Sequence, residues 1–393
     1  MVINMECLIG MRMMLADNSI DAVVTDPPYG LSKQPDMSEV LRHWLNGDDY
    51  IHTGGGFMGK TWDSFVPGPS IWKEVFRVLK PGGHLLAFFG TRTYDLGTLA
   101  IRLAGFEIRD QIDWVYGSGF PKSLDVSKAT GDEQWEGWGT ALKPAHEPIC
   151  VARKPLAGTV AENVMQFGTG GMNIDNCRID SDGSHKRKYQ PTNNERKIFS
   201  KQKGFIPTNA EGRFPANFVH DGSDEVVSLF PAKAGAAAPV KGIEQSQAST
   251  GNVTDQRERI PGAFHADSGS AARFFYCAKA SKSDRDEGVL LAKRTAAEMT
   301  DREPDTDGLN SPRAGAGCTS GARNNHPTVK PTALMQWLVR LVTPPGGKVL
   351  DPFTGSGSTG KACAIEGFDF IGFEMDPHYC EIAKQRINYV HNR

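Results

Sequence analysis

Positions 26–29 carry an aspartate, two prolines and a tyrosine, directly after the apolar run at 21–25. An exocyclic amine is a poor nucleophile because its lone pair is delocalised, and acceptors aimed at its N–H groups draw that pair back onto nitrogen. The Asp26 carboxylate and the Pro27 carbonyl are two such acceptors, held by rigid prolines, and Tyr29 offers a flat face for an extruded base. The same residues also suit an ordinary turn after a strand, so this motif alone leaves methyl transfer to an amine and a plain turn both open.

A glycine-rich turn later in the chain indicates a second functional element. The pattern at 348–360 predicts a buried strand that enters the turn, and a helix follows from Ser358 to Glu366. Glycines there let a ligand approach the backbone at a helix N-terminus. Residues 368–374 predict another strand, whose last residue, Glu374, stands about 20 residues beyond the turn, where an acid holds ribose hydroxyls. Together these features predict a nucleoside-binding βαβ unit.

The frame from Gly355 to Lys361 also matches the spacing of a phosphate-binding loop. A nucleotide hydrolase needs a serine or threonine hydroxyl for magnesium at the next position, which here is Ala362. The sequence therefore disfavours the phosphate-loop interpretation.

Further motifs stand in a fixed order around these two, at 80–90, 119–123, 143–148 and 325–331. With them, the chain resembles an amino-group DNA methyltransferase that uses S-adenosylmethionine, of the permuted beta order in which the catalytic motif precedes the cofactor motif. The resemblance covers residues 1–155 and 324–393. It implies an α/β fold with a doubly wound, mostly parallel sheet, Rossmann-like and circularly permuted in motif order, with an inserted target-recognition region. The alternation of strands and helices along the chain independently predicts a doubly wound sheet.

The resemblance also implies site residues. Residues 5–7 read Met-Glu-Cys where the family often has Gly-Asp-Cys, so Glu6 takes the place of an aspartate that binds the cofactor adenine. The catalytic residues implied are Asp26, Pro27, Pro28 and Tyr29. The cofactor-binding residues implied are Glu6, Cys7, Asp26, His326, Thr328, Lys330, Asp351, Pro352, Phe353, Gly355, Ser356, Gly357 and Glu374. No metal is required.

The expected organisation is a catalytic half at 1–155, an inserted target-recognition region at 156–323 and a cofactor half at 324–393. Within the insertion lies a basic cluster, whose position favours contact with DNA phosphates over the plain solvated surface that such runs usually form. The basic cluster consists of Lys186, Arg187, Lys188, Arg196 and Lys197.

Other segments give coarser predictions. Residues 71–79 predict a helix, and residues 84–89, 109–116 and 148–152 predict strands. Residues 272–279 predict a strand whose aromatic side chains face the core. Residues 30–59 show little periodicity and predict a mobile loop beside the active site. Residues 231–262 and 296–324 predict flexible connections.

Composition agrees with this interpretation without producing it. The chain has 393 residues and a net charge of −2, from 44 Lys and Arg against 46 Asp and Glu, so DNA binding requires a clustered basic face. Its seven cysteines are scattered and include no C-x-x-C pair, which argues against a zinc site or a disulfide frame and for a reducing cytoplasm. Neither a signal peptide nor a membrane span is expected, so the predicted location is cytoplasmic.

The sequence thus predicts methyl transfer from S-adenosylmethionine to adenine N6 in double-stranded DNA, by base flipping and direct transfer. The absence of a Pro-Cys nucleophile motif argues against cytosine C5 chemistry. Aspartate at the first catalytic position resembles adenine enzymes more than cytosine-N4 enzymes, which remain the alternative, together with RNA or a protein amide as substrate. A nucleotide hydrolase and a non-catalytic nucleic-acid-binding protein are less favoured. The sequence leaves open the recognition site, a partner restriction nuclease, and whether the protein is a monomer or a dimer.

Overall fold

The computed structural model describes residues 1–31, 33–52, 61–119, 123–179, 212–234, 269–279, 281–293 and 322–392. Several sequence predictions lie outside these ranges. They are the basic cluster, the glycine-rich end of the segment 30–59, residues 120–122, and most of the segments 231–262 and 296–324.

The strands of the described ranges form a single sheet in the order β1-β9-β8-β2-β3-β5-β4-β6-β7. Strand β5 runs antiparallel to both of its neighbours, and every other pairing is parallel. All strands except β5 therefore end at the same edge, which we call the carboxyl edge. The strands are β1 (Val2–Asn4), β2 (Ile20–Thr25), β3 (Leu79–Phe88), β4 (Glu107–Val115), β5 (His146–Arg153), β6 (Phe218–His220), β7 (Tyr276–Cys277), β8 (Lys348–Asp351) and β9 (Asp369–Glu374).

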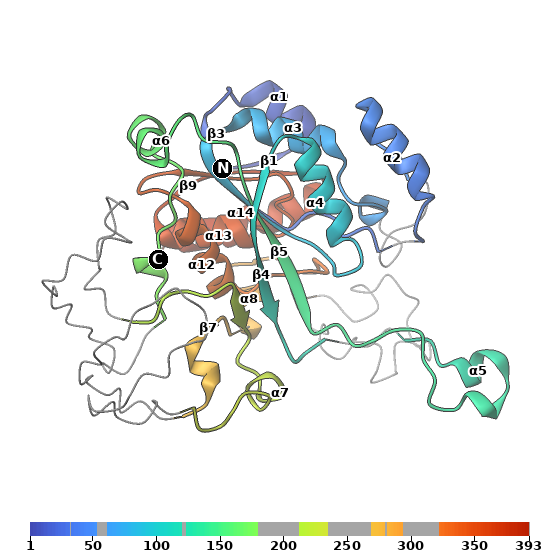
Figure 1. The fold of residues 1–393 in the computed structure, drawn as a ribbon. Coiled ribbons are helices and arrows are strands. Elements are labelled where there is room, and N and C mark those ends of the chain that lie inside the picture. The colour runs from blue at the N-terminus through green and yellow to red at the C-terminus, as the bar shows by residue number, and fades with distance from the viewer. Residues whose placement is uncertain are drawn as a thin grey trace, which may run out of the picture.

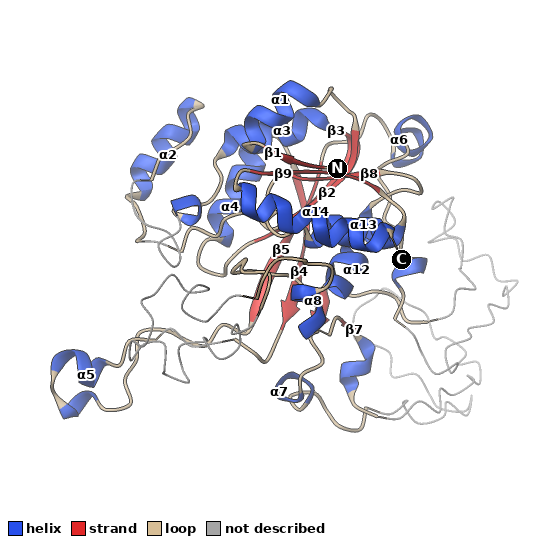
Figure 2. Cartoon of the chain, turned by 180° about the vertical axis from the view of Figure 1, so that it is seen from behind, coloured by secondary structure: helices blue, strands red, loops and turns tan. Residues whose placement is uncertain are grey.

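Helices cover both faces of this sheet, as the doubly wound prediction required (Figure 1, Figure 2). Alternate residues of the central strands face opposite cores, since Val23 packs with α1, α3 and α4 while Val24 packs with α12, α13 and α14. The main helices are α1 (Cys7–Met14), α3 (Pro69–Val78), α4 (Tyr94–Leu103), α12 (Thr332–Val342), α13 (Ser358–Glu366) and α14 (Pro377–His391). Shorter or outlying helices are α2 (Met37–Asn46), α5 (Val126–Thr130), α6 (Val160–Phe167), α7 (Asp224–Val227) and α8 (Lys282–Asp286).

Strands β8 and β2 are neighbours whose connections leave in opposite directions along the sheet. The chain passes from β8 through α13 to β9 on one side, and from β2 through α3 to β3 on the other. Such a reversal opens a crevice outside the carboxyl ends of the two strands, which is where ligands bind in open α/β sheets. The fold therefore predicts a site beyond Thr25 and Asp351.

Local sequence explains the elements that frame this crevice. Helix α13 begins after Gly357 and ends at Gly367, and both glycines adopt the left-handed conformation that favours this residue. Helix α3 starts with Pro69 in its first turn, where the missing N–H costs nothing.

Two sequence predictions about elements are wrong. Part of the segment predicted as an irregular loop forms α2, which begins after Asp36, ends at Gly47 in the left-handed conformation, and buries Val40 and Trp44 on one face. Residues 272–279 do not form one strand, because a 3-10 helix at Ala271–Phe274 precedes the short β7.

Phe275 and Tyr276 of that segment are half-buried, and both pack against other aromatic rings. Tyr276 stacks on Trp337 with centroids 5.3 Å apart, and Phe275 contacts Phe218 and Phe230. Strands β6 and β7 come from the interval 156–323 and extend the central sheet beyond β4. The boundaries of the three expected units stay a prediction.

One arm projects from the body between β4 and β5 and carries α5 and the 3-10 turn Glu133–Trp135 (Figure 1, Figure 2). Its base is fixed by the hydrogen bond from Tyr116 N to the Ala145 carbonyl, 2.9 Å long. In the part of the chain that the structure describes, every helix is too short or too polar to cross a membrane.

Candidate active site

The two sequence motifs meet at the crevice between β2 and β8. Asp26 follows the last residue of β2, and Asp351 is the last residue of β8. The Thr25 hydroxyl donates to Asp351 Oδ1 at 2.6 Å, which joins the two strand ends directly. Burial raises the pKa of Asp351 to about 6. The carboxyl ends of neighbouring parallel strands thus bring together residues more than three hundred positions apart.

The backbone of the segment 26–29 is fixed by two side chains that the sequence did not single out. Asp63 is buried and accepts from the backbone N–H of Tyr29 at 2.7 Å and of Gly30 at 3.1 Å. The Thr93 hydroxyl donates to the Tyr29 carbonyl at 2.6 Å. Gly30 has φ +65° and its missing Cβ would lie 2.8 Å from Val66 N, so another residue there would displace the segment. These contacts hold Asp26 and Tyr29 in place.

Asp26 belongs to a cluster of charged and phenolic groups. Lys330 Nζ donates to Asp26 Oδ2 at 2.7 Å, and lies 3.1 Å from both Glu147 Oε2 and the Tyr29 hydroxyl. The Tyr29 hydroxyl lies 2.9 Å from Asp26 Oδ1 and 3.0 Å from Glu147 Oε2. The Tyr116 hydroxyl donates to Glu147 Oε1 at 3.4 Å. We call Asp26, Tyr29, Glu147 and Lys330 the charge cluster.

Ionisation in the charge cluster follows from its burial. Burial, and then the carboxylates of Asp26 and Glu147, raise the pKa of Tyr29 well above its usual value, so the phenol stays neutral. Burial lowers the pKa of Lys330, but the two carboxylates outweigh it and raise that pKa above the ordinary value. Lys330 is therefore a charged group inside the site, although the resemblance placed it among the cofactor ligands.

The glycine-rich turn lies beside this cluster. Gly355 and Gly357 both have positive φ, and a Cβ on Gly355 would lie 2.8 Å from His326 Nε2. Glu374, at the end of β9, accepts from Gly355 N and from Asp376 N, each at 2.8 Å. Burial raises the pKa of Glu374 to about 7 despite these two donors. The turn and the acid thus form one unit, as their spacing predicted.

The segment 324–331 covers the turn. His326 is buried, its Nδ1 lies 2.7 Å from the Thr328 carbonyl, and Arg285 donates to the His326 carbonyl at 2.7 Å. Burial lowers the pKa of His326 to about 4, so its ring is neutral at pH 7. Trp62 stacks on this ring, with centroids 6.2 Å apart and planes 18° from parallel.

A hollow of about 390 Å³ opens next to Glu374 and is lined by Trp62, Met375, Asp376 and Pro377. An acceptor carboxyl beside a hollow with an aromatic wall suits a nucleoside, whose hydroxyls donate and whose base stacks. Trp62 was not among the residues predicted from the sequence to form the site. The remaining predicted cofactor residues Pro352, Phe353 and Ser356 lie in the turn itself, where Phe353 packs on Trp72.

Glu6 and Cys7 lie at the same edge, because Asn4 at the end of β1 pairs with Glu374. The Glu6 carboxylate caps α1, accepting from Leu8 N and Ile9 N at 2.9 Å each, and Cys7 Sγ lies 3.3 Å from it. The contact of Glu6 with an adenine stays a prediction.

The phosphate-loop interpretation finds no support in the position of its lysine. Lys361 is buried and its Nζ lies 2.6 Å from Glu287 Oε2. A phosphate-binding lysine must reach its ligand from the loop, whereas this one is held in an ion pair. Among the described residues, no three His, Cys, Asp or Glu side chains are placed to hold a metal ion.

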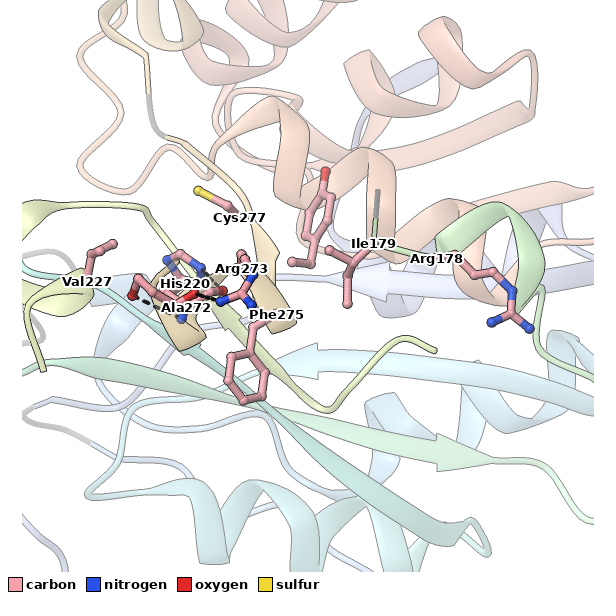
Figure 3. A pocket seen from close by; sticks show the side chains of 10 residues that line it. Arg178, Ile179, His220, Val227, Ala272, Arg273, Phe275 and Cys277 are labelled. Carbon is pink, nitrogen blue, oxygen red and sulfur yellow. Dashed lines mark hydrogen bonds between the residues drawn. The ribbon is translucent and has the colours of Figure 1, made fainter. Parts of the chain in front are cut away.

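A second hollow, of about 490 Å³, lies apart from the charge cluster, at the β7 edge of the sheet (Figure 3). One lining arginine, Arg273, donates hydrogen bonds to the backbone carbonyls of Gly269, Ser270 and Ala234. Buried His220 at its floor also has backbone partners on both ring nitrogens. Arg273 and His220 are therefore both engaged by the protein's own backbone.

Glu374 and the glycine-rich turn lie at the switch point of the sheet, next to Asp26. This arrangement is typical of α/β enzymes that bind a nucleoside-containing cofactor. Residues 20–385 match the family model described as DNA methylase, N6_N4_Mtase. The chain belongs to this N6/N4 DNA methylase family, whose members are amino-group DNA methyltransferases that use S-adenosylmethionine. The match confirms the predicted family, enzyme class and cofactor, and the mostly parallel sheet confirms the predicted fold class.

Relatives in the curated collections align over short stretches. The chain is 30% identical over 115 residues to the type II methyltransferase M.Cfr9I of Citrobacter freundii, covering 29% of this chain and 32% of that protein. It is 41% identical over 64 residues to the DNA adenine methyltransferase YhdJ of Escherichia coli strain K12, covering 16% and 22%. These alignments thus span about a third or less of each relative.

Solved structures align over nearly the whole chain. The cytosine-N4-specific PvuII DNA methyltransferase has 14% identity and a TM-score of 0.45, covering 100% of this chain and 91% of that one. The M1.HpyAVI–SAM complex has 14% identity and a TM-score of 0.39, covering 98% of each.

Proposed function

We propose that this protein transfers a methyl group from S-adenosylmethionine to the N6 amine of adenine in double-stranded DNA. The observation that carries the proposal is Asp26, an acceptor fixed at the switch point between β2 and β8, next to the glycine-rich turn that hydrogen-bonds to Glu374. Aspartate at this position favours adenine, and the relative YhdJ is named an adenine enzyme. Cytosine N4 is the alternative, because its amine offers the same two N–H donors.

The residues around the turn fit the cofactor. Glu374 presents an acceptor for ribose hydroxyls, and the hollow beside it has the Trp62 ring as a flat wall for adenine. The neighbouring charge cluster holds two carboxylates and one ammonium, an excess of one negative charge when both acids are ionised. A negative environment suits a sulfonium ion. We assign the remaining predicted cofactor residues of the turn, together with His326 and Thr328, to the same site.

The chain's contribution to the reaction is positioning and electrostatics. When bound, S-adenosylmethionine supplies an electrophilic methyl group. Asp26 Oδ and the Pro27 carbonyl accept the two N–H bonds of a flipped base, which directs the nitrogen lone pair out of the ring plane. The excess negative charge of the cluster stabilises the ammonium that the amine becomes, until it releases a proton. Tyr29, with its hydroxyl held by the cluster, offers its ring to the base.

DNA contact is proposed for the basic cluster of the insertion, which lies outside the described residues. The type II name of M.Cfr9I supports a role in restriction–modification alongside a partner nuclease. Both proposals concern the whole protein and are tested separately from its chemistry.

The deciding experiment identifies the methylated nucleoside. Duplex DNA is incubated with the protein and methyl-labelled S-adenosylmethionine, digested, and analysed by chromatography and mass spectrometry. Label in N6-methyl-2′-deoxyadenosine is the expected result. Label in N4-methylcytosine would replace adenine by cytosine, and label in neither base would refute DNA amino methylation.

A further inference from the structure

We propose that Lys330 is a positioning residue of methyl transfer: held between Asp26 and Glu147, it keeps the Asp26 carboxylate aimed at the target amine rather than binding the cofactor. This inference rests on the proposed function and adds Glu147 and Lys330 to the transfer site. It starts from the surroundings of one buried ammonium, whose side chain is only 5% exposed.

The donors of Lys330 are all engaged within the cluster. An ammonium has three N–H donors, and the partners within hydrogen-bond reach are Asp26 Oδ2 at 2.7 Å, Glu147 Oε2 at 3.1 Å and the Tyr29 hydroxyl at 3.1 Å. The ammonium also lies 4.9 Å from the Phe88 ring centre. A contact with another ligand would require Lys330 to release one of these partners in a dry site, which costs more than in water.

The contacts fix the direction of the Asp26 carboxylate. One oxygen lies against the Tyr29 hydroxyl and the other against Lys330, so rotation of the carboxylate would break both contacts. Each carboxylate oxygen has two lone pairs, so one remains available for an incoming amine. Lys330 and Tyr29 therefore hold the Asp26 carboxylate in place and leave lone pairs free to accept from the amine.

Glu147 reaches the cluster because of the direction of its strand. It lies at the amino end of β5, and β5 is antiparallel to its neighbours, so this end stands at the carboxyl edge beside Asp26. The Tyr29 hydroxyl has one proton and cannot donate to both acids at once. Glu147 thus supplies a second negative charge that Lys330 must balance, and the net charge of the cluster depends on both residues.

Charge balance gives the test. Lys330→Met removes the cation and leaves two carboxylates together, and Lys330→Met with Glu147→Gln restores the original excess of one negative charge. The rate of a single turnover is measured against pH, with saturating S-adenosylmethionine and duplex DNA, and cofactor affinity is measured by calorimetry. Lys80→Met is the matched control, because Lys80 forms an ion pair with Asp21 at the opposite edge of the sheet.

Lys330→Met is expected to slow transfer by ~10- to 100-fold, the range for a misplaced reacting group, with little change in cofactor affinity. The pH profile of this variant is expected to differ from that of the wild type, because the charge cluster has lost its ammonium group. The double variant is expected to be faster than Lys330→Met alone, and Lys330→Arg, which keeps the charge, to retain the wild-type pH profile.

Two results would overturn the inference. Weaker cofactor binding with an unchanged rate at saturation would make Lys330 a cofactor ligand. A loss of single-turnover rate that is equal at every pH and is not recovered in the double variant would show that Lys330 only packs the site. A wild-type protein that methylates no DNA would instead refute the proposed function, and this inference with it.

Discussion

Glu374 is expected to make cofactor affinity depend on pH. Its side chain is half-buried at the end of β9, and this burial raises the pKa of the carboxyl to about 7. A carboxylate accepts a hydroxyl proton more strongly than the neutral acid does, so a bound ribose favours the ionised form. Below about pH 7 the acid must first lose a proton, and affinity for S-adenosylmethionine is therefore expected to fall as the pH drops through this value.

The magnitude follows from the two kinds of hydrogen bond. A bond to a charged acceptor contributes ~1.5–3 kcal/mol and a bond to a neutral one ~0.5–1.5 kcal/mol, so the difference is about 1.4 kcal/mol, or about tenfold in Kd. Calorimetry at about two pH units on either side of the pKa measures most of this change. Repeating the titration near pH 7 in buffers of different ionisation enthalpy is expected to show release of about half a proton per cofactor bound.

Two variants separate this effect from other acids. Glu374→Gln is neutral at every pH, so its affinity is expected to be flat and, at high pH, weaker than wild type by ~1–3 kcal/mol. Glu381→Gln removes an exposed carboxyl on α14 and is expected to keep the wild-type profile. Equal wild-type affinity on both sides of pH 7 would refute the reasoning. A slope that persists in Glu374→Gln would point to Asp351, whose pKa is about 6.

Three other perturbations test the site and the insertion. Asp26→Ala is expected to reduce turnover by at least ~100-fold, with cofactor affinity nearly unchanged, and near-normal turnover would remove Asp26 from the mechanism. Lys361→Met is expected to lower the free energy of unfolding by ~2 kcal/mol, as measured by denaturant titration, which is less than for a fully buried pair because Glu287 is partly exposed to solvent. Tight binding of magnesium–ATP to the wild type would instead support the phosphate-loop interpretation. Replacing the basic cluster by alanine is expected to weaken DNA binding and flatten its salt dependence by about one counterion per lost phosphate contact, whereas parallel slopes with equal affinity would return it to solvated surface.

Local patterns were sufficient for the elements that carry the cofactor turn. The helix predicted from Ser358 to Glu366 has these bounds in the structure, because glycines mark both of its ends. The meeting of Asp26 with Asp351 also follows from sequence, since parallel strands share a carboxyl edge. Helix α2 was equally readable, from Asp36 and Gly47 at its ends and the apolar pair Val40 and Trp44, but the glycines and polar residues around it obscured that pattern.

The composition of the charge cluster could not be predicted in the same way. Glu147 reaches Asp26 only because β5 is antiparallel, and no residue within β5 specifies its direction. Asp63 and Thr93 act through hydrogen bonds to backbone, which leave no periodic pattern in the sequence. The motif at 325–331 identified Lys330 as a site residue, but only the fold shows that its ammonium group contacts Asp26.

We expect the arm between β4 and β5 to tolerate changes in its length without moving Glu147. The two strands pair along their length up to Val115 opposite His146, and the hydrogen bond between Tyr116 and Ala145 closes the base of the arm. The place of Glu147 is therefore set by the sheet below the arm and is independent of how much chain the arm contains. The arm could be lengthened, shortened or replaced by a tight hairpin, in evolution or by design, while Glu147 keeps its place opposite Trp114 in the sheet.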